Sequence, residues 1–407
     1  MELRAIRGTR DILPAESAVH RHIERVCRKH AERLGFREII LPVFEDRALY
    51  ARSVGETSDI VEKQMFELQD SRERPFVLRP EGTASMVRAF VMNGLQEREP
   101  LKRFYYSGPM YRHERPQKGR YREFFQFGLE MFNEPAPASD ILLVKLVADI
   151  LRTLGAPVDI MLNSVGCPAC RPAYTETLRA HLSSAAHELC EDCRRRLDRN
   201  PLRVLDCKVD AAKGAAFPRI TDSLCERCRD DYRTTVQQLR RTGVAVVEDP
   251  LLVRGLDYYT GVVFECRASA LDAAQNTVCA GGRYDGLVRE FGGGDVPACG
   301  CAFGVDRLCS LVAESSDTIT RVGIAMVDDR YLPGALDIAF ALDGVRVIGP
   351  FSGRSLKAQM RVFNNAGCRY VIIVGEEVRG GNAVLKDLSD GGQRVVPVAG
   401  LREAFRG

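Results

Sequence analysis

The clearest pointer to the architecture of this chain is Phe104-Tyr-Tyr-Ser-Gly-Pro-Met-Tyr-Arg-His-Glu-Arg-Pro-Gln-Lys-Gly-Arg-Tyr-Arg-Glu-Phe-Phe-Gln126. Strand patterns over residues 102–112 and 122–133 flank the turn formers Glu-Arg-Pro-Gln-Lys-Gly. Residues 102–123 contain two carboxylates, Glu114 and Glu123, against seven cations, namely Lys102, Arg103, Arg112, Arg115, Lys118, Arg120 and Arg122. Two strands joined by a basic loop can hold a polyphosphate and reach a nucleic-acid backbone. A solvated charged hairpin is the alternative interpretation.

The second strand has a polar face. Because side chains alternate along a strand, Phe124, Gln126, Gly128 and Glu130 share one side. A carboxylate, an amide and a glycine gap on one face suit a small polar ligand better than a hydrophobic core.

Outside this pair, the apolar patterns predict further elements. Helices are expected over residues 15–34, 81–93, 140–154, 284–290 and 302–313. Strands are expected over residues 36–44, 63–70, 74–79, 250–266 and 277–283. Residues 166–243 are rich in Cys and Arg and predict an inserted helical module. Residues 322–374 alternate as β-α-β-α-β, and a hairpin is expected after them, over residues 384–388 and 394–398. Residues 314–320 are a polar linker.

Composition places the chain among ordinary globular proteins. It has 407 residues, a formal net charge of +3 and 14 cysteines. Its sequence has no run of eighteen apolar residues and no apolar signal core near Met1, so we expect a cytoplasmic protein without a membrane span.

A second polar cluster is Leu252-Val-Arg-Gly-Leu-Asp-Tyr-Tyr-Thr260. Arg254 offers a forked cation for a carboxylate or phosphate. Within a strand, the adjacent Tyr258 and Tyr259 must face opposite sides, which predicts that at most one of them does chemistry. The glycine-rich segments 280–286 and 300–307 allow close approach of backbone to a ligand, although each alone is weak evidence.

Together these segments resemble the class II aminoacyl-tRNA synthetases, and within them the histidyl-tRNA synthetases. The stretch from Phe104 to Gln126 is similar to motif 2, Pro297-Ala-Cys-Gly-Cys-Ala-Phe-Gly-Val-Asp-Arg307 to motif 3, and residues 35–42 to motif 1, the dimer element. Leu252–Tyr259 and Gly281-Gly-Arg-Tyr-Asp-Gly-Leu287 resemble the two histidine-specific signatures.

The resemblance implies a histidine–tRNA ligase. It would form histidyl-adenylate and pyrophosphate from L-histidine and ATP with Mg²⁺, then transfer histidine to the 3′-terminal adenosine of tRNA(His). By the same resemblance, Arg112 and Arg254 are the catalytic residues at the α-phosphate, and Arg307 binds the ATP tail. The histidine-binding residues it implies are Glu81, Thr83, Gln126, Glu130, Tyr258, Tyr259 and Tyr284.

The resemblance also implies an organisation and partners. The fold class is an α+β class II core, an antiparallel sheet flanked by helices, over residues 1–165 and 245–315, with a cysteine-rich helical insertion over 166–244. Residues 320–407 would form a C-terminal α/β anticodon-binding domain. The partner of the chain would be a second copy, giving a homodimer. The tRNA-contacting positions would be Arg115, Gln117, Arg120, Arg354 and Lys357.

Three Cys-x-x-Cys pairs occur in the insertion, and the resemblance implies no metal there. The pairs are Cys167 with Cys170, Cys190 with Cys193, and Cys225 with Cys228, and Cys207 lies between them. Two such pairs can make a four-thiolate structural zinc site, and free reduced thiols are the alternative. Which pairs would combine is left open by the spacing.

Two other hypotheses compete with an active synthetase. One is the regulatory subunit of ATP phosphoribosyltransferase, a paralogue without the anticodon domain; the other is a nucleic-acid-binding pseudoenzyme. The presence of Arg112, Arg254, Arg307 and residues 322–398 argues against both.

Overall fold

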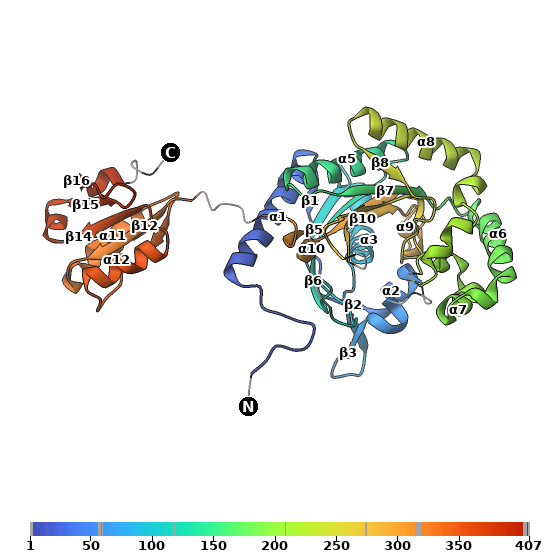
Figure 1. Cartoon of the computed structure of the whole chain (residues 1–407), viewed down its shortest axis with the longest axis horizontal. Coiled ribbons are helices and arrows are strands. Elements are labelled where there is room, and N and C mark those ends of the chain that lie inside the picture. The colour runs from blue at the N-terminus through green and yellow to red at the C-terminus, as the bar shows by residue number, and fades with distance from the viewer. Residues whose placement is uncertain are drawn as a thin grey trace. The chain divides into compact units, whose positions relative to one another are not determined.

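The chain consists of two compact units, Met1–Glu314 and Ser315–Gly407 (Figure 1). The computed structural model describes residues 3–55, 58, 60–117, 119–207, 209–272, 275–313, 319–401 and 405. Lys118 of the basic loop and residues 314–318 of the expected linker lie outside this part. Of the helices described, none is both long and apolar enough to cross a membrane.

An eight-stranded sheet forms the centre of the first unit. In spatial order its strands are β1 (Arg37–Glu38), β5 (Arg103–Tyr111), β6 (Glu123–Phe132), β11 (Ala298–Gly304), β10 (Thr277–Arg283), β9 (Thr260–Arg267), β7 (Asp159–Ser164) and β8 (Val246–Glu248). From β5 to β7 every neighbouring pair is antiparallel, while β1 and β8 add parallel edges. The predicted antiparallel sheet, and its β5–β6 pair in particular, is confirmed.

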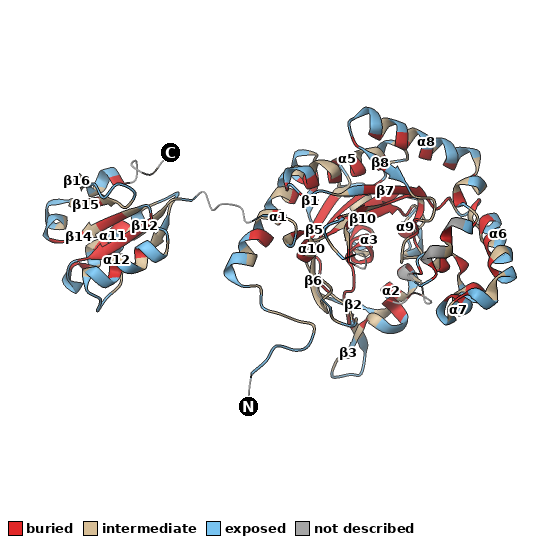
Figure 2. Ribbon diagram, in the orientation of Figure 1, coloured by how far each residue is buried: buried red, intermediate tan, exposed pale blue. Residues whose placement is uncertain are grey.

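Hydrophobic cores form around this sheet, with helices covering it (Figures 1 and 2). In α1 (Pro14–Arg33), Val19, Ile23 and Cys27 are buried, as the helical spacing predicts. They join one core with the apolar stripe of α5 (Ala138–Thr153). A different core contains apolar residues of α3 (Thr83–Met92). In this helix, residues 83–87, 89 and 90 are buried. The remaining helices of this part are α2 (Arg47–Val54), α4 (Leu95–Arg98), α9 (Leu287–Glu290) and α10 (Val305–Cys309).

A small antiparallel sheet lies outside the large one, in the order β2 (Phe44–Asp46), β4 (Pro75–Leu78) and β3 (Phe66–Gln69). The predicted pairing of residues 63–70 with 74–79 is therefore confirmed. The expected strand over 36–44 is shorter than predicted, since β1 has only two residues. Pro42 has no N–H group to donate to a strand ladder, which limits the strand.

Two predicted elements begin later in the chain than expected. Residues 250–259 form turns and irregular backbone, and β9 begins only at Thr260. Ala302 belongs to β11, and helix α10 begins at Val305. Residues 298–301 of β11 are buried in succession, so the segment has no period-two alternation to separate it from a buried helix.

The insertion between β7 and β8 is helical, as predicted. It consists of α6 (Arg171–Ser184), α7 (Glu191–Arg199) and α8 (Glu226–Arg241), with 3₁₀ turns at Ala186–Glu188, Pro201–Val204, Ala211–Ala216 and Ile220–Ser223.

The second unit is an α/β domain, and its predicted alternation is confirmed. Its sheet has the order β13 (Arg346–Ile348), β12 (Arg321–Met326), β14 (Tyr370–Val374), β15 (Asn382–Asp387) and β16 (Gln393–Pro397). The first three strands are parallel and the last two form the expected hairpin. The helices are α11 (Leu332–Ala341) and α12 (Leu356–Asn365), and Phe363 of α12 is fully buried.

Candidate active site

A cavity that is open to solvent lies among β6, β10, β11, the basic loop and the segment before β9. The lining includes nine of the residues predicted for the site, namely Glu81, Thr83, Arg112, Arg120, Gln126, Arg254, Tyr258, Tyr259 and Arg307. Residues separated by more than two hundred positions in the chain thus meet around one space.

Positive charge gathers in the cavity. Arg112 follows β5, where its Nε donates to the carbonyl of Pro80 (2.9 Å) and its guanidinium lies 5.3 Å from the ring centroid of Phe124. Burial, together with the neighbouring Arg112 and Arg120, lowers the pKa of Arg307 to about 10. Like charges held together out of water favour an anionic ligand that would neutralise them.

Arg254 is held by a carboxylate that sequence inspection missed. Its Nη1 forms an ion pair with Glu265 of β9, and its guanidinium lies 5.9 Å from the Tyr259 ring centroid. Burial works against this charge, but Glu265 and Tyr259 outweigh it and raise the pKa of Arg254 above its ordinary value. Glu265 also accepts a hydrogen bond from Arg267 Nε (3.0 Å), so its carboxylate is held in place on β9. It can thereby fix the position of Arg254.

Glu81 and Thr83 stand at the start of α3. Both carboxylate oxygens of Glu81 accept from backbone, from Thr83 N–H at 2.7 Å and Ala84 N–H at 2.9 Å. These bonds satisfy two N–H groups that the helix start leaves unpaired. Burial raises the pKa of the Glu81 carboxyl, although the two backbone bonds oppose the shift. The carboxylate is thereby fixed at the cavity wall.

Glu130 and Tyr284 lie behind the wall rather than in the lining. Thr83 Oγ1 donates to Glu130 Oε1 (2.7 Å), and the Tyr284 hydroxyl donates to the other carboxylate oxygen. Glu130 is fully buried, and burial raises its pKa to about 8 despite these bonds. A Cβ at Gly300, its neighbour on β11, would lie 1.6 Å from Glu130 Oε2, so only glycine leaves room for this carboxyl.

The predicted polar face of β6 is present. Gln126 lines the cavity, and Gly128 leaves the space that the Tyr106 ring fills, because a Cβ there would lie 2.1 Å from Tyr106 Cζ. Three buried atoms of the lining have no hydrogen-bond partner among the described residues, namely the Tyr106 hydroxyl, Gln126 Oε1 and Arg254 Nε. Buried polar atoms are normally paired, so these three indicate where a polar ligand would bind.

The structure contradicts the premise of the prediction about the two tyrosines, which was that they face opposite sides of a strand. Tyr258 and Tyr259 both line the cavity, with ring centroids 4.7 Å apart. The expectation that at most one could take part assumed a strand, and residues 250–259 are not one. In irregular backbone, adjacent side chains can turn to the same side.

Of the predicted tRNA positions in the first unit, Arg120 lines the cavity, whereas Arg115 and Gln117 do not. Arg115 and Gln117 are exposed in the basic loop, and Arg120 forms an ion pair with Glu114. In the second unit, Arg354 and Lys357 are exposed at the start of α12, where the side chain of Ser355 accepts from Ala358 N–H.

Comparison with known proteins agrees with this geometry. The family model described as histidyl-tRNA synthetase matches residues 8–308. The chain is 42% identical to the histidine–tRNA ligase of Desulfatibacillum aliphaticivorans, over 98% of each chain, and 42% identical to that of Thermotoga maritima, over 97% of this chain and 96% of the other. The solved structure of the apo histidyl-tRNA synthetase of S. aureus is similar over the full length of both chains, with a TM-score of 0.82 and 31% identity. The chain belongs to the histidyl-tRNA synthetase family.

In this member of the histidyl-tRNA synthetase family, three lining or supporting residues were not predicted. Asp306 accepts from Arg10 (2.9 Å) and from Phe125 N–H (2.7 Å), and Gln275 accepts from Arg307 Nη2 (2.9 Å). Glu265 is the third. The position of Asp306 next to Arg307 in the motif 3 segment could have indicated a role at the site. No motif in the sequence surrounds Glu265 or Gln275, so neither could be predicted.

The cysteines of the insertion separate into two groups in this histidyl-tRNA synthetase. One group contains Cys167, Cys170, Cys225 and Cys228, and the other contains Cys190, Cys193, Cys207 and Asp210. The first and third Cys-x-x-Cys pairs therefore combine. Cys207 and Asp210 were not predicted as ligands, although Cys-x-x-Asp has the same spacing as the pairs.

Proposed function

We propose that this chain is a histidine–tRNA ligase that forms histidyl-adenylate from L-histidine and ATP and then charges the 3′-terminal adenosine of tRNA(His). The observation that carries this proposal is a single cavity lined by Arg112, Arg254 and Arg307 together with the polar groups of Glu81 and Gln126. Membership of the histidyl-tRNA synthetase family supports the same activity.

The proposed chemistry needs no protein nucleophile. The carboxylate of histidine attacks the α-phosphate of ATP, and Arg112 and Arg254 stabilise the charge that develops there, while Arg307 holds the ATP tail. Mg²⁺ bound to the phosphates would neutralise part of their charge, and Glu114 is a carboxylate of the lining that could share the ion.

We assign histidine recognition to the polar groups that line the cavity together with these arginines. Glu81, Thr83 and Gln126 would hold the amino group, and Glu130 and Tyr259 the imidazole. Tyr258 would complete the pocket, and Tyr284 would hold Glu130 from behind the lining. A site that hydrogen-bonds two ring nitrogens rejects isosteres that leave those bonds unmade.

We further propose that the insertion and the basic loop, through Arg115, Gln117 and Arg120, approach the acceptor end of the tRNA, while Arg354 and Lys357 of α12 contact its anticodon end. The chain would act as a homodimer. In support, Ile40 is 87% exposed within the segment that resembles motif 1, and Phe44 beside it is 59% exposed.

Histidine-dependent exchange of labelled pyrophosphate into ATP tests the proposal directly. The folded chain should catalyse exchange with histidine and not with glutamine or other amino acids. A folded chain that gives no exchange would instead indicate a binding protein built on the same fold.

A further inference from the structure

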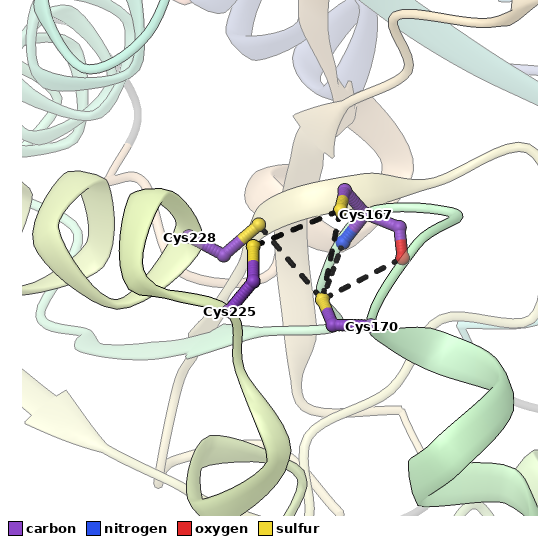
Figure 3. Close-up of side chains that lie close together, drawn as sticks. All are labelled: Cys167, Cys170, Cys225 and Cys228. Atoms are coloured by element: carbon purple, nitrogen blue, oxygen red, sulfur yellow. Dashed lines mark hydrogen bonds between the residues drawn. The ribbon is translucent and has the colours of Figure 1, made fainter.

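Four cysteines meet where the insertion joins the catalytic unit. Cys167 and Cys170 precede α6, whereas Cys225 and Cys228 begin α8 (Figure 3). The Sγ atoms of Cys167 and Cys170 are 3.7 Å apart, those of Cys167 and Cys225 4.0 Å, and those of Cys170 and Cys228 3.9 Å. All four are free thiols whose side chains point toward one another.

A second, separate cluster lies within the insertion. Cys190 and Cys193 stand at the start of α7, and Cys207 and Asp210 follow the turn at Pro201–Val204. Cys190 Sγ lies 3.7 Å from Cys207 Sγ, which in turn lies 3.9 Å from Asp210 Oδ2. In each cluster the four potential ligand atoms all lie within 4.8 Å of one another.

These separations match a tetrahedral metal site. Zn–S bonds of about 2.3 Å in a tetrahedron place neighbouring sulfurs roughly 3.8 Å apart. Backbone N–H groups also point at the sulfurs, from Cys167 to Cys170 Sγ (3.1 Å) and from Cys193 to Cys190 Sγ (3.4 Å), which would stabilise thiolates. We propose that this chain binds two structural Zn²⁺ ions, one on Cys167, Cys170, Cys225 and Cys228 and one on Cys190, Cys193, Cys207 and Asp210.

The first ion would close the base of the insertion. Its ligands come from the start of the inserted segment, just after β7, and from the start of α8, so one ion would tie α8 to the place where the segment leaves β7. Residues next to them already contact the catalytic unit, because Gly166 accepts from Gly261 N–H (3.0 Å) and Arg171 donates to the Tyr259 carbonyl.

The second ion would fix the turn that supports the histidine-specific segment. Asn200 Nδ2 and Arg203 Nη2, between its ligands in the chain, both donate to Asp257 Oδ1, at 3.2 and 2.8 Å. Asp257 lies in the segment with Arg254 and Tyr259. This positioning effect on the active site rests on the proposed function; the metal sites themselves do not.

Metal analysis of the full-length chain tests the stoichiometry. The purified protein, freed of loosely held metal by gel filtration, should contain two zinc ions per chain by mass spectrometry of the metals. Cys225→Ser and Cys207→Ser should each reduce the content to one ion, and the double variant to none. The matched control is Cys368→Ser, a buried cysteine of the second unit, which should retain two. Iron in place of zinc, or fewer than two ions in the folded natural chain, overturns the proposal.

A second measurement avoids dependence on variants that fold poorly. The natural chain is titrated with a mercurial thiol reagent while a coloured chelator reports released zinc. Two ions should be released as seven thiols react. Zinc release unrelated to thiol modification overturns the assignment. Because metal content is measured without substrate, a chain with two ions and no pyrophosphate exchange would contradict only the proposed function.

Discussion

At the scale of single residues, Arg254 carries the clearest prediction. Arg254→Ala should lower the rate of histidine-dependent pyrophosphate exchange at least a hundredfold, because a fixed cation at a developing charge contributes about 10²–10³ in rate. Arg254→Lys keeps the charge without the fork and should recover only part of the activity.

The matched control for Arg254 is Arg267→Ala. Arg267 contacts the same Glu265 carboxylate (3.0 Å) but does not line the cavity. Its replacement should leave the exchange rate nearly unchanged, with the circular dichroism spectrum of both variants native. Equal losses in the two variants would mean that Arg254 acts only by neutralising Glu265.

Glu130 makes the stability of the fold depend on pH. Between its ordinary pKa of 4.5 and about 8, the folded chain keeps the Glu130 proton that the unfolded chain has lost. The stabilising contribution of this group is therefore complete below 4.5 and is lost as the pH rises toward 8, at a rate of up to about 1.4 kcal/mol per pH unit.

Urea unfolding at pH 6 and 7.5 measures this effect. Glu130→Gln should show a smaller fall in the free energy of unfolding between the two pH values than the natural chain. Glu123→Gln, a partly exposed position of the same strand, serves as the control and should follow the natural chain. If all three proteins lose stability in parallel, another group is responsible for the slope.

At the scale of elements, the pairing of β6 with β11 decides the shape of the histidine wall. In Gly300→Ala, the new Cβ would meet both Glu130 Oε2 at 1.6 Å and the Leu129 carbonyl at 2.6 Å. Glu130 is held by Thr83 and Tyr284, so it cannot swing away freely. We expect a loss of about 1–3 kcal/mol in stability and a raised KM for histidine.

Gly294→Ala is the control for this substitution. Gly294 lies in the loop before β11, and a Cβ there meets no atom within 4 Å. Its melting temperature and its KM for histidine should stay close to those of the natural chain. An unchanged KM in Gly300→Ala would show that the position of Glu130 does not govern histidine binding.

The same elements show what sequence can and cannot predict. The β5–β6 pair and α1 were predictable because alternation and helical periodicity are strong where one face is buried. The segment 250–259 was not, because its apolar residues pack without regular backbone. The ion pair of Arg254 with Glu265 depends on the register of β9 within the sheet, which no local pattern encodes.

At the scale of the whole molecule, the two units have separate hydrophobic cores. The groups proposed for adenylate formation all belong to the first unit, whereas Arg354 and Lys357 belong to the second. Substitutions in the first unit should therefore affect adenylate formation, whereas substitutions of Arg354 and Lys357 should affect only the transfer of histidine to tRNA. Sequence could predict this division, since the β-α-β-α-β pattern after residue 320 differs in kind from the antiparallel pattern before it.

Charge reversal on α12 tests this separation. Arg354→Glu combined with Lys357→Glu should leave pyrophosphate exchange unchanged, because no residue of the cavity is altered, and should raise the KM for tRNA(His) in aminoacylation. Each lost phosphate contact should also reduce the slope of log affinity against log salt concentration by about one. Arg394→Glu, exposed on β16 of the same unit, makes half of that change of charge away from α12 and should alter the KM for tRNA little. If it raises that KM as much as either single substitution on α12, net charge of the unit rather than the face of α12 governs tRNA binding.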